Sequence, residues 1–180
     1  MKNQNTKKLA YAALFLALCL VLPMLTGQIP QIGSMLLPMH IPVLLCGLVC
    51  GWQYGAAVGF VAPLLRSVLF GMPPMYPVAI AMAFELLTYG LVIGLVYRRM
   101  AQKGAAGVYA ALLTAMVAGR LVWGVAEVVL LGLGGKAFTA QAFLAGALLN
   151  AVPGIIVQLV LIPAVMAALQ KTGAVKEYDE

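Results

Sequence analysis

The sequence predicts an all-α integral membrane protein, built as a single bundle of about six transmembrane helices. Hydrophobic residues make up 64% of the 180 residues and charged residues only 9%, and the mean hydropathy is +1.04. Soluble domains carry about a quarter charged residues. A helix needs about 20 mainly apolar residues to cross a bilayer, so this chain can supply about six crossings and no soluble domain. We expect a cytoplasmic segment at 1–7, a transmembrane domain at 8–170 and a cytoplasmic tail at 171–180.

Glycine, proline and charged residues divide the apolar sequence into helices. We place the helices at 8–26, 37–50, 54–70, 75–98, 106–132 and 140–169. The stretch Gly51 to Gly55 separates the second helix from the third, and the turn Gly71 to Pro74 separates the third from the fourth. The first apolar stretch is long, ends at Pro23 and lacks a convincing cleavage site, so we expect a mature helix and no removable signal peptide.

The basic residues give the expected orientation. Eight of them fall on one side of a six-helix topology, and the opposite loops offer only Lys136; the eight are Lys2, Lys7, Lys8, Arg98, Arg99, Lys103, Lys171 and Lys176. Because cytoplasmic loops of membrane proteins are enriched in lysine and arginine, we expect both termini to be cytoplasmic. The net charge of +6 therefore reflects topology and does not indicate nucleic-acid binding.

The segment after the first helix, Thr26 to Pro38, is uncharged but contains glutamines, prolines and glycines. Irregular backbone at membrane depth persists only where protein buries it or water reaches it. We therefore expect this segment to fold over the outer end of the bundle. It could serve as a lid that becomes less accessible when a ligand binds, or as a plain connector.

Four ionisable residues lie inside the expected spans: Arg66, Glu85, Arg120 and Glu127. A charge within a transmembrane helix is costly, so such residues face the bundle interior, pair with each other or mark a ligand path. An ion-pair network that only holds the helices together is the alternative.

The spacing of these residues along the sequence predicts which of them share a helix face. Arg120, Trp123 and Glu127 follow an i, i+3, i+7 pattern and share one helix face. Glu85 is followed one turn later by Tyr89, and Asn150 lies in the expected sixth helix. Aromatic faces with a few polar groups suit a flat heterocyclic ligand in an apolar pocket. For Trp123 alone, ordinary packing explains its position equally well.

The sequence lacks the motifs that are typical of metal sites, nucleotide-binding sites and common hydrolases. His40 is the single histidine and the three cysteines are scattered, so we expect no metal site. The sequence contains no G-x-x-x-x-G-K-[ST], H-E-x-x-H or G-x-S-x-G pattern, so we expect neither catalysis nor a cofactor, and any ATP hydrolysis would occur on another chain. In the first helix, Ala13 and Ala17 form a small-x-x-x-small pair that would let another helix approach closely.

The chain resembles the substrate-binding S components of energy-coupling factor (ECF) transporters over about residues 6 to 170. The resemblance is carried by the first-helix run L-A-Y-A-A-L-F-L-A at 9–17, the long uncharged loop after it, the glycine-rich stretch C-G-L-V-C-G-W-Q-Y-G-A-A-V-G at 46–59, and Asn150. It implies that Ala13 and Ala17 dock on the membrane-embedded T component. It also implies a substrate-binding role for Glu85, Arg120, Trp123, Glu127 and Asn150, to which we add Tyr89, Arg66 and His40 as candidates.

The resemblance further implies two cytoplasmic ATPase subunits as partners and a place in the bacterial cell membrane. The ligand would be a vitamin or a related heterocyclic micronutrient, with a slight preference for a B6-like or benzimidazole-like compound. A stand-alone facilitator or channel for small solutes, with the same four charges along a water path, is the alternative.

Overall fold

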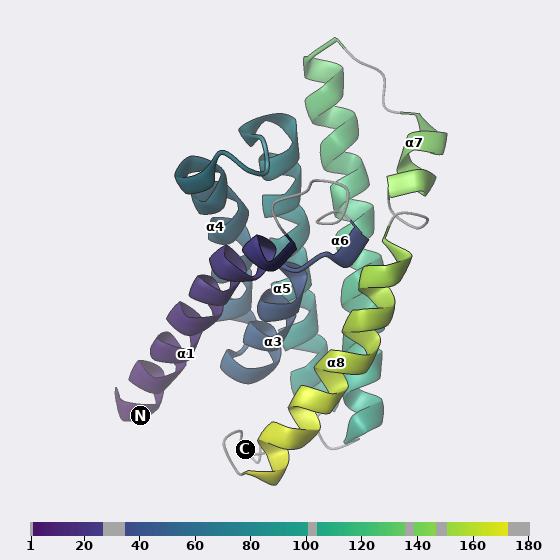
Figure 1. The fold of residues 1–180 in the computed structure, drawn as a ribbon. Helices are drawn as coiled ribbons and strands as arrows, with labels where there is room; N and C mark the ends of the chain where they lie inside the picture. The colour runs from purple at the N-terminus through teal and green to yellow at the C-terminus, as the bar shows by residue number, and fades with distance from the viewer. Residues whose placement is uncertain (1, 27–34, 101–103, 136–138, 147–150, 173–180) are drawn as a thin grey trace.

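The computed structural model confirms the helical bundle and describes residues 2–26, 35–100, 104–135, 139–146 and 151–172. Five of its helical segments are long and apolar enough to span a membrane. Figure 1 shows the order along the chain: α1 (Lys2–Val21), the 3₁₀ turn η1 (Leu22–Thr26), α3 (His40–Cys50), α4 (Trp52–Phe70), the π-helical turn η2 (Met75–Ala79), α5 (Ile80–Met100), α6 (Ala105–Leu133), α7 (Ala140–Leu144) and α8 (Val152–Lys171).

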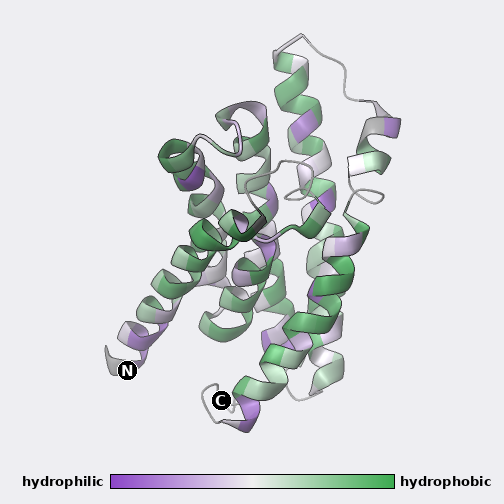
Figure 2. Cartoon of the chain, in the orientation of Figure 1, coloured by the Kyte–Doolittle hydropathy of each residue, from purple (hydrophilic) through white to green (hydrophobic). Residues whose placement is uncertain are grey.

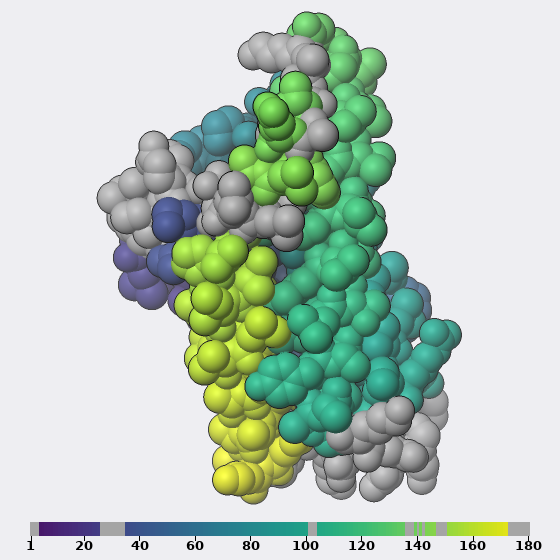
Figure 3. All heavy atoms as spheres, turned by 90° about the vertical axis from the view of Figure 1, so that its right-hand side faces the viewer, coloured from purple at the N-terminus to yellow at the C-terminus, as the bar shows by residue number. Residues whose placement is uncertain are grey.

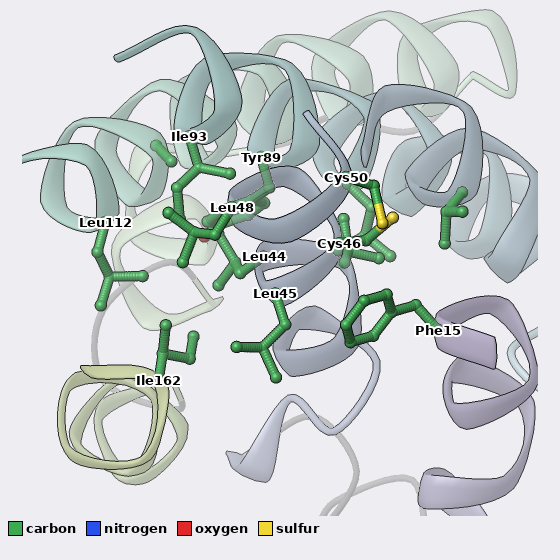
Figure 4. Close-up of a cluster of buried hydrophobic side chains, with 14 of the residues drawn as sticks. Phe15, Leu44, Leu45, Cys46, Leu48, Cys50, Tyr89, Ile93, Leu112 and Ile162 are labelled. Carbon is green, nitrogen blue, oxygen red and sulfur yellow. The ribbon is translucent and has the colours of Figure 1, made fainter. Parts of the chain in front are cut away.

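Helix α3 is the centre of the bundle. It has 11 residues and is about 16 Å long, roughly half the thickness of a bilayer core. It packs against α1, α4, α5 and α8, and most of its side chains are buried. Figure 4 shows the apolar core around it, to which Phe15, Tyr89 and Ile162 contribute from three other helices.

Glycines bring α3, α4 and α5 into backbone contact. A Cβ atom at Gly47 or at Gly55 would lie 2.8 Å from the carbonyl oxygen of Gly90, and one at Gly90 would lie 2.7 Å from the backbone nitrogen of Ala56. Along the antiparallel pair α4 and α5, the same close approach recurs where Gly59 meets Leu86. In membranes such contacts favour helix association, because lipid provides no hydrophobic driving force.

The two described ends of the chain lie at the same end of the bundle. The start of α1, the end of α8, the end of α5 and the start of α6 all lie toward the bottom of Figure 1. Most of the residues in the helices are hydrophobic, and hydrophilic residues occur near the start of α1 and the end of α8 as well as at a few positions within the bundle (Figure 2). The shared end fits the charge pattern of the sequence, and the orientation of that end in the membrane stays a prediction.

The predicted sixth helix, 140–169, is wrong as one continuous element. The structure has a short α7 and a separate α8 that begins at Val152, with Pro153 in its first turn. Proline has no backbone N–H and is favoured in the first turn of a helix, where that N–H would have no partner, so Pro153 fits a helix that begins at Val152. Figure 3 shows α8 beside α6, with α7 next to them.

Two further boundaries differ from the prediction. The first helix begins at Lys2 instead of residue 8, and Pro23 marks its change to the 3₁₀ turn η1. The break between α3 and α4 is the single residue Gly51, whose positive φ of 98° glycine tolerates, so α4 begins at Trp52 instead of residue 54.

Gly90→Ala tests the glycine contacts. The added methyl group would meet the α4 backbone, which cannot move aside as a side chain can, so we expect a loss of about 1–3 kcal/mol of stability. Gly132→Ala is the matched control, because nothing lies within 4 Å of a Cβ there. In detergent-solubilised protein, Gly90→Ala should melt well below the parent and Gly132→Ala at or slightly above it. Equal melting temperatures would show that the helices are not packed this closely.

Candidate functional site

A buried ion pair joins α5 to α6. Glu85 on α5 is 1% exposed, and its Oε1 lies 2.9 Å from Nη1 of Arg120 on α6. The contact is an ion pair, and Glu85 Oε1 makes no hydrogen bond among the described residues. A buried ion pair offsets its desolvation only when hydrogen bonds satisfy the remaining polar atoms. The pair is therefore incomplete as a purely structural element.

His40 and Tyr89 adjoin this pair from α3 and α5. Nε2 of His40 lies 3.4 Å from Glu85 Oε1, and the imidazole meets the Tyr89 ring edge-to-face, with ring centroids 5.1 Å apart. Tyr89 in turn lies against Gly119 of α6, where a Cβ would come within 2.7 Å of the phenol ring. Three helices thus place a histidine, a carboxylate, a phenol and a guanidinium in one buried polar cluster.

Seven buried side-chain nitrogen and oxygen atoms in the described residues have no hydrogen-bond partner, and they belong to only four residues. These residues are His40, Glu85, Arg120 and Gln158. A buried polar atom without a partner costs about 1–3 kcal/mol, so their concentration needs an explanation. The arrangement offers both donors and acceptors to a polar molecule.

Gln158 was missed by the sequence reasoning. It is 1% exposed and belongs to the buried stripe of α8, Gly154, Gln158, Ile162 and Met166. This stripe faces the bundle, since a Cβ at Gly154 would lie 2.6 Å from the carbonyl oxygen of Met35, just before α3. Gln158 is a single polar residue in an apolar helix, four residues after Gly154. This pattern is the signal that could have revealed it.

Of the three residues predicted to share one face of α6, Arg120 and Trp123 are in contact, and Glu127 makes no salt bridge among the described residues. The Arg120 guanidinium carbon lies 5.9 Å from the centre of the Trp123 ring. Trp123 also stacks on Phe143 of α7, with centroids 6.1 Å apart and an angle of 25° between the planes. Phe143 is a second residue that the sequence did not indicate. Glu127 is buried and has no salt-bridge partner among the described residues.

Arg66 lies elsewhere. Its guanidinium donates a hydrogen bond to the carbonyl oxygen of Leu20 in the last turn of α1 and lies 5.2 Å from the centre of the Phe70 ring. A cation at the C-terminal end of a helix stabilises the exposed carbonyls there. The structure therefore gives Arg66 a contact with α1 and none with the polar cluster. Asn150 and most of the expected lid at Thr26 to Pro38 lie outside the described residues.

Ala13 and Ala17 are exposed on α1, on the side away from the buried Ala12 and Phe15. An open apolar groove lies between α6 and α7 and is lined by Gly124, Val128 and Phe143, among others. The groove holds no charged side chain and lies outside the polar cluster, so we do not place ligand binding there.

The comparisons with known proteins give one match. Residues 7–166 match the family model for the ECF transporter, substrate-specific component. Neither the curated proteins nor the solved structures gave a significant match to the chain. Members of this family are non-catalytic, substrate-binding subunits that lie in the cell membrane as multi-pass proteins and work with a T component and ATPases. Because the match covers most of the sequence, the chain belongs to the family of ECF transporter substrate-specific components.

Proposed function

We propose that the buried polar cluster binds a small heterocyclic micronutrient with high affinity for import by an ECF complex. The observation that carries this proposal is the set of buried polar atoms that make no hydrogen bond in the described part of the chain, on His40, Glu85, Arg120 and Gln158. A bundle that only needed stability would gain by replacing such groups with apolar ones. A polar ligand supplies hydrogen-bond partners for these atoms. A ligand without the matching polar groups leaves them unsatisfied and therefore binds more weakly.

The aromatic residues support a ring-shaped ligand. Trp123 lies beside Arg120, and Glu127 follows one turn later on the same helix. A ring that stacks on the indole would bring a ring nitrogen or an amine within reach of the Glu127 carboxylate. A B6-like pyridine and a benzimidazole both have this form.

The exposed alanines of α1 support a docking face for the T component. Ala13 and Ala17 present no bulk beyond Cβ, so another helix could approach the α1 backbone. Family membership favours this role over the alternative of a stand-alone facilitator, because ECF substrate-specific components work with a T component.

Mass spectrometry of small molecules released from the purified, folded protein tests the binding role. We expect one heterocyclic compound in near-stoichiometric amount, absent from an Arg120→Ala preparation that is purified in parallel. A parent protein that carries no compound and is stabilised by no vitamin-like molecule would contradict the proposal.

Ala13→Trp and Ala17→Trp should leave melting temperature and ligand retention unchanged but abolish uptake in cells that express the full transporter. The indole would fill the groove that a partner helix needs. Val160→Trp, which places the same ring at an exposed position of α8, serves as the control and should transport normally. Uptake that equals the parent at matched expression would remove α1 as the docking face.

Trp123→Ala and Glu127→Gln should weaken binding of the retained compound more than they lower stability. Loss of a stacking face costs about 1–3 kcal/mol, or roughly tenfold to a hundredfold in affinity. Titration gives the affinity, and melting without ligand gives the stability. If melting temperatures fall while affinity holds, these residues only support the bundle.

Gln158→Leu should have opposite effects on stability and binding. Leucine removes a buried amide whose nitrogen and oxygen have no partner, so the melting temperature of the free protein should rise. Affinity should fall at least tenfold if the amide contacts ligand. Gln53→Leu, at an exposed position of α4, is the control and should change neither. A Gln158→Leu protein with full affinity would exclude Gln158 from the site.

A further inference from the structure

Arg120 uses only part of its guanidinium in the protein. Nη1 faces Glu85, whereas Nε and Nη2 are buried and have no hydrogen-bond partner. In a planar guanidinium, Nε and one terminal nitrogen form an edge with two parallel N–H bonds. This edge matches the two oxygens of a carboxylate, which it binds through a pair of charge-assisted hydrogen bonds.

No side chain of the described residues fills this edge. The Glu85 carboxylate pairs with Nη1 of Arg120. Glu127 lies seven residues after Arg120 on α6, which corresponds to a rise of about 10 Å along the helix. Neither carboxylate makes a hydrogen bond to Nε or Nη2 of Arg120, and both nitrogen atoms are shielded from solvent. A ligand oxygen pair is the partner whose geometry fits.

Charge balance restricts the ligand further. Glu85 already offsets the charge of Arg120, and Glu127 has no salt-bridge partner in the described residues. A simple anion would bring a third carboxylate near the two of the protein, which is unfavourable at low dielectric. A ligand that also carries a positive or N–H-donating group at its other end gives Glu127 a partner and removes this repulsion.

We infer that the substrate is a flat, amphoteric ring compound that binds end to end along α6. Its carboxylate occupies the Nε–Nη2 edge of Arg120, its ring lies by Trp123, and its amine or ring N–H donates to Glu127. This inference rests on the proposed binding role of the cluster and narrows it to one chemical class. A B6-like or benzimidazole-like ring fits the inference only if it also carries a carboxyl group.

Matched acid and amide probes test the inference. The panel is 4-aminobenzoate, pyridine-3-carboxylate and imidazole-4-acetate, each beside its neutral carboxamide, titrated against purified protein freed of retained compounds. We expect at least one acid to bind tenfold to a hundredfold more tightly than its amide, which corresponds to charge-assisted hydrogen bonds at one edge. Benzoate, which lacks the donor for Glu127, should bind more weakly than 4-aminobenzoate.

Arg120→Lys separates recognition from support of the fold. Lysine keeps the positive charge but has no two-pronged edge, so the preference for acid over amide should fall close to one. Loss of structural support alone would weaken acid and amide equally and leave their ratio unchanged. Arg98→Lys, at the exposed end of α5, is the control and should keep the full ratio.

The outcomes separate this inference from the proposed function. Amides that bind as tightly as acids, a retained compound without a carboxyl group, or an unchanged ratio in Arg120→Lys would overturn the inference and leave the binding role intact. If no acid in the panel binds while a neutral heterocycle does, the inference also fails. A protein that neither retains a compound nor binds any probe would contradict both this inference and the proposed binding role.

Discussion

The close backbone contact among α3, α4 and α5 is the constraint on which the site depends. Gly47, Gly55 and Gly90 meet where no side chain fits between the helices. Helix α5 presents Leu86 and Gly90 to α4, while Glu85 and Tyr89 point toward α3 and α6. The position of the Glu85 carboxylate relative to His40 is thus set by glycine contacts one turn away, and a helix shift of even an ångström would change it.

The polar cluster forms where this three-helix core meets α6. The core contributes His40, Glu85 and Tyr89, and α6 contributes Arg120. Gln158 of α8 is a further buried polar residue whose amide makes no hydrogen bond in the described part of the chain. Buried polar atoms without partners lower stability in the free protein, and a ligand that binds only the folded state raises it by mass action. Ligand binding should therefore tighten the contact between the core and α6, since it supplies partners to both sides.

The proposed binding cluster and the proposed docking residues lie in different parts of the fold. Ala13 and Ala17 lie on the exposed side of α1, which contacts the core through α3 and α4. Arg66, expected from its charge to belong to the binding site, instead holds the end of α1 to α4 through Leu20. Its burial has a structural explanation: an intramembrane arginine at the end of a helix pairs with carbonyls that would otherwise lack partners.

The membrane-spanning helical fold could be predicted from the sequence, because composition and the length of the apolar stretches leave few alternatives in a bilayer. The sequence also identified Glu85, Arg120 and Trp123 as neighbours of a polar region, since intramembrane charges and i, i+3 spacing are local features. It could not separate Arg66 from that group, because a charge does not reveal which neighbouring helix it meets. The contacts between helices showed that Arg66 meets α1, that Gln158 is buried, that Phe143 stacks on Trp123, and that a new helix begins at Val152. These depend on how helices far apart in sequence rotate and pack, and glycine contacts between their backbones set that packing.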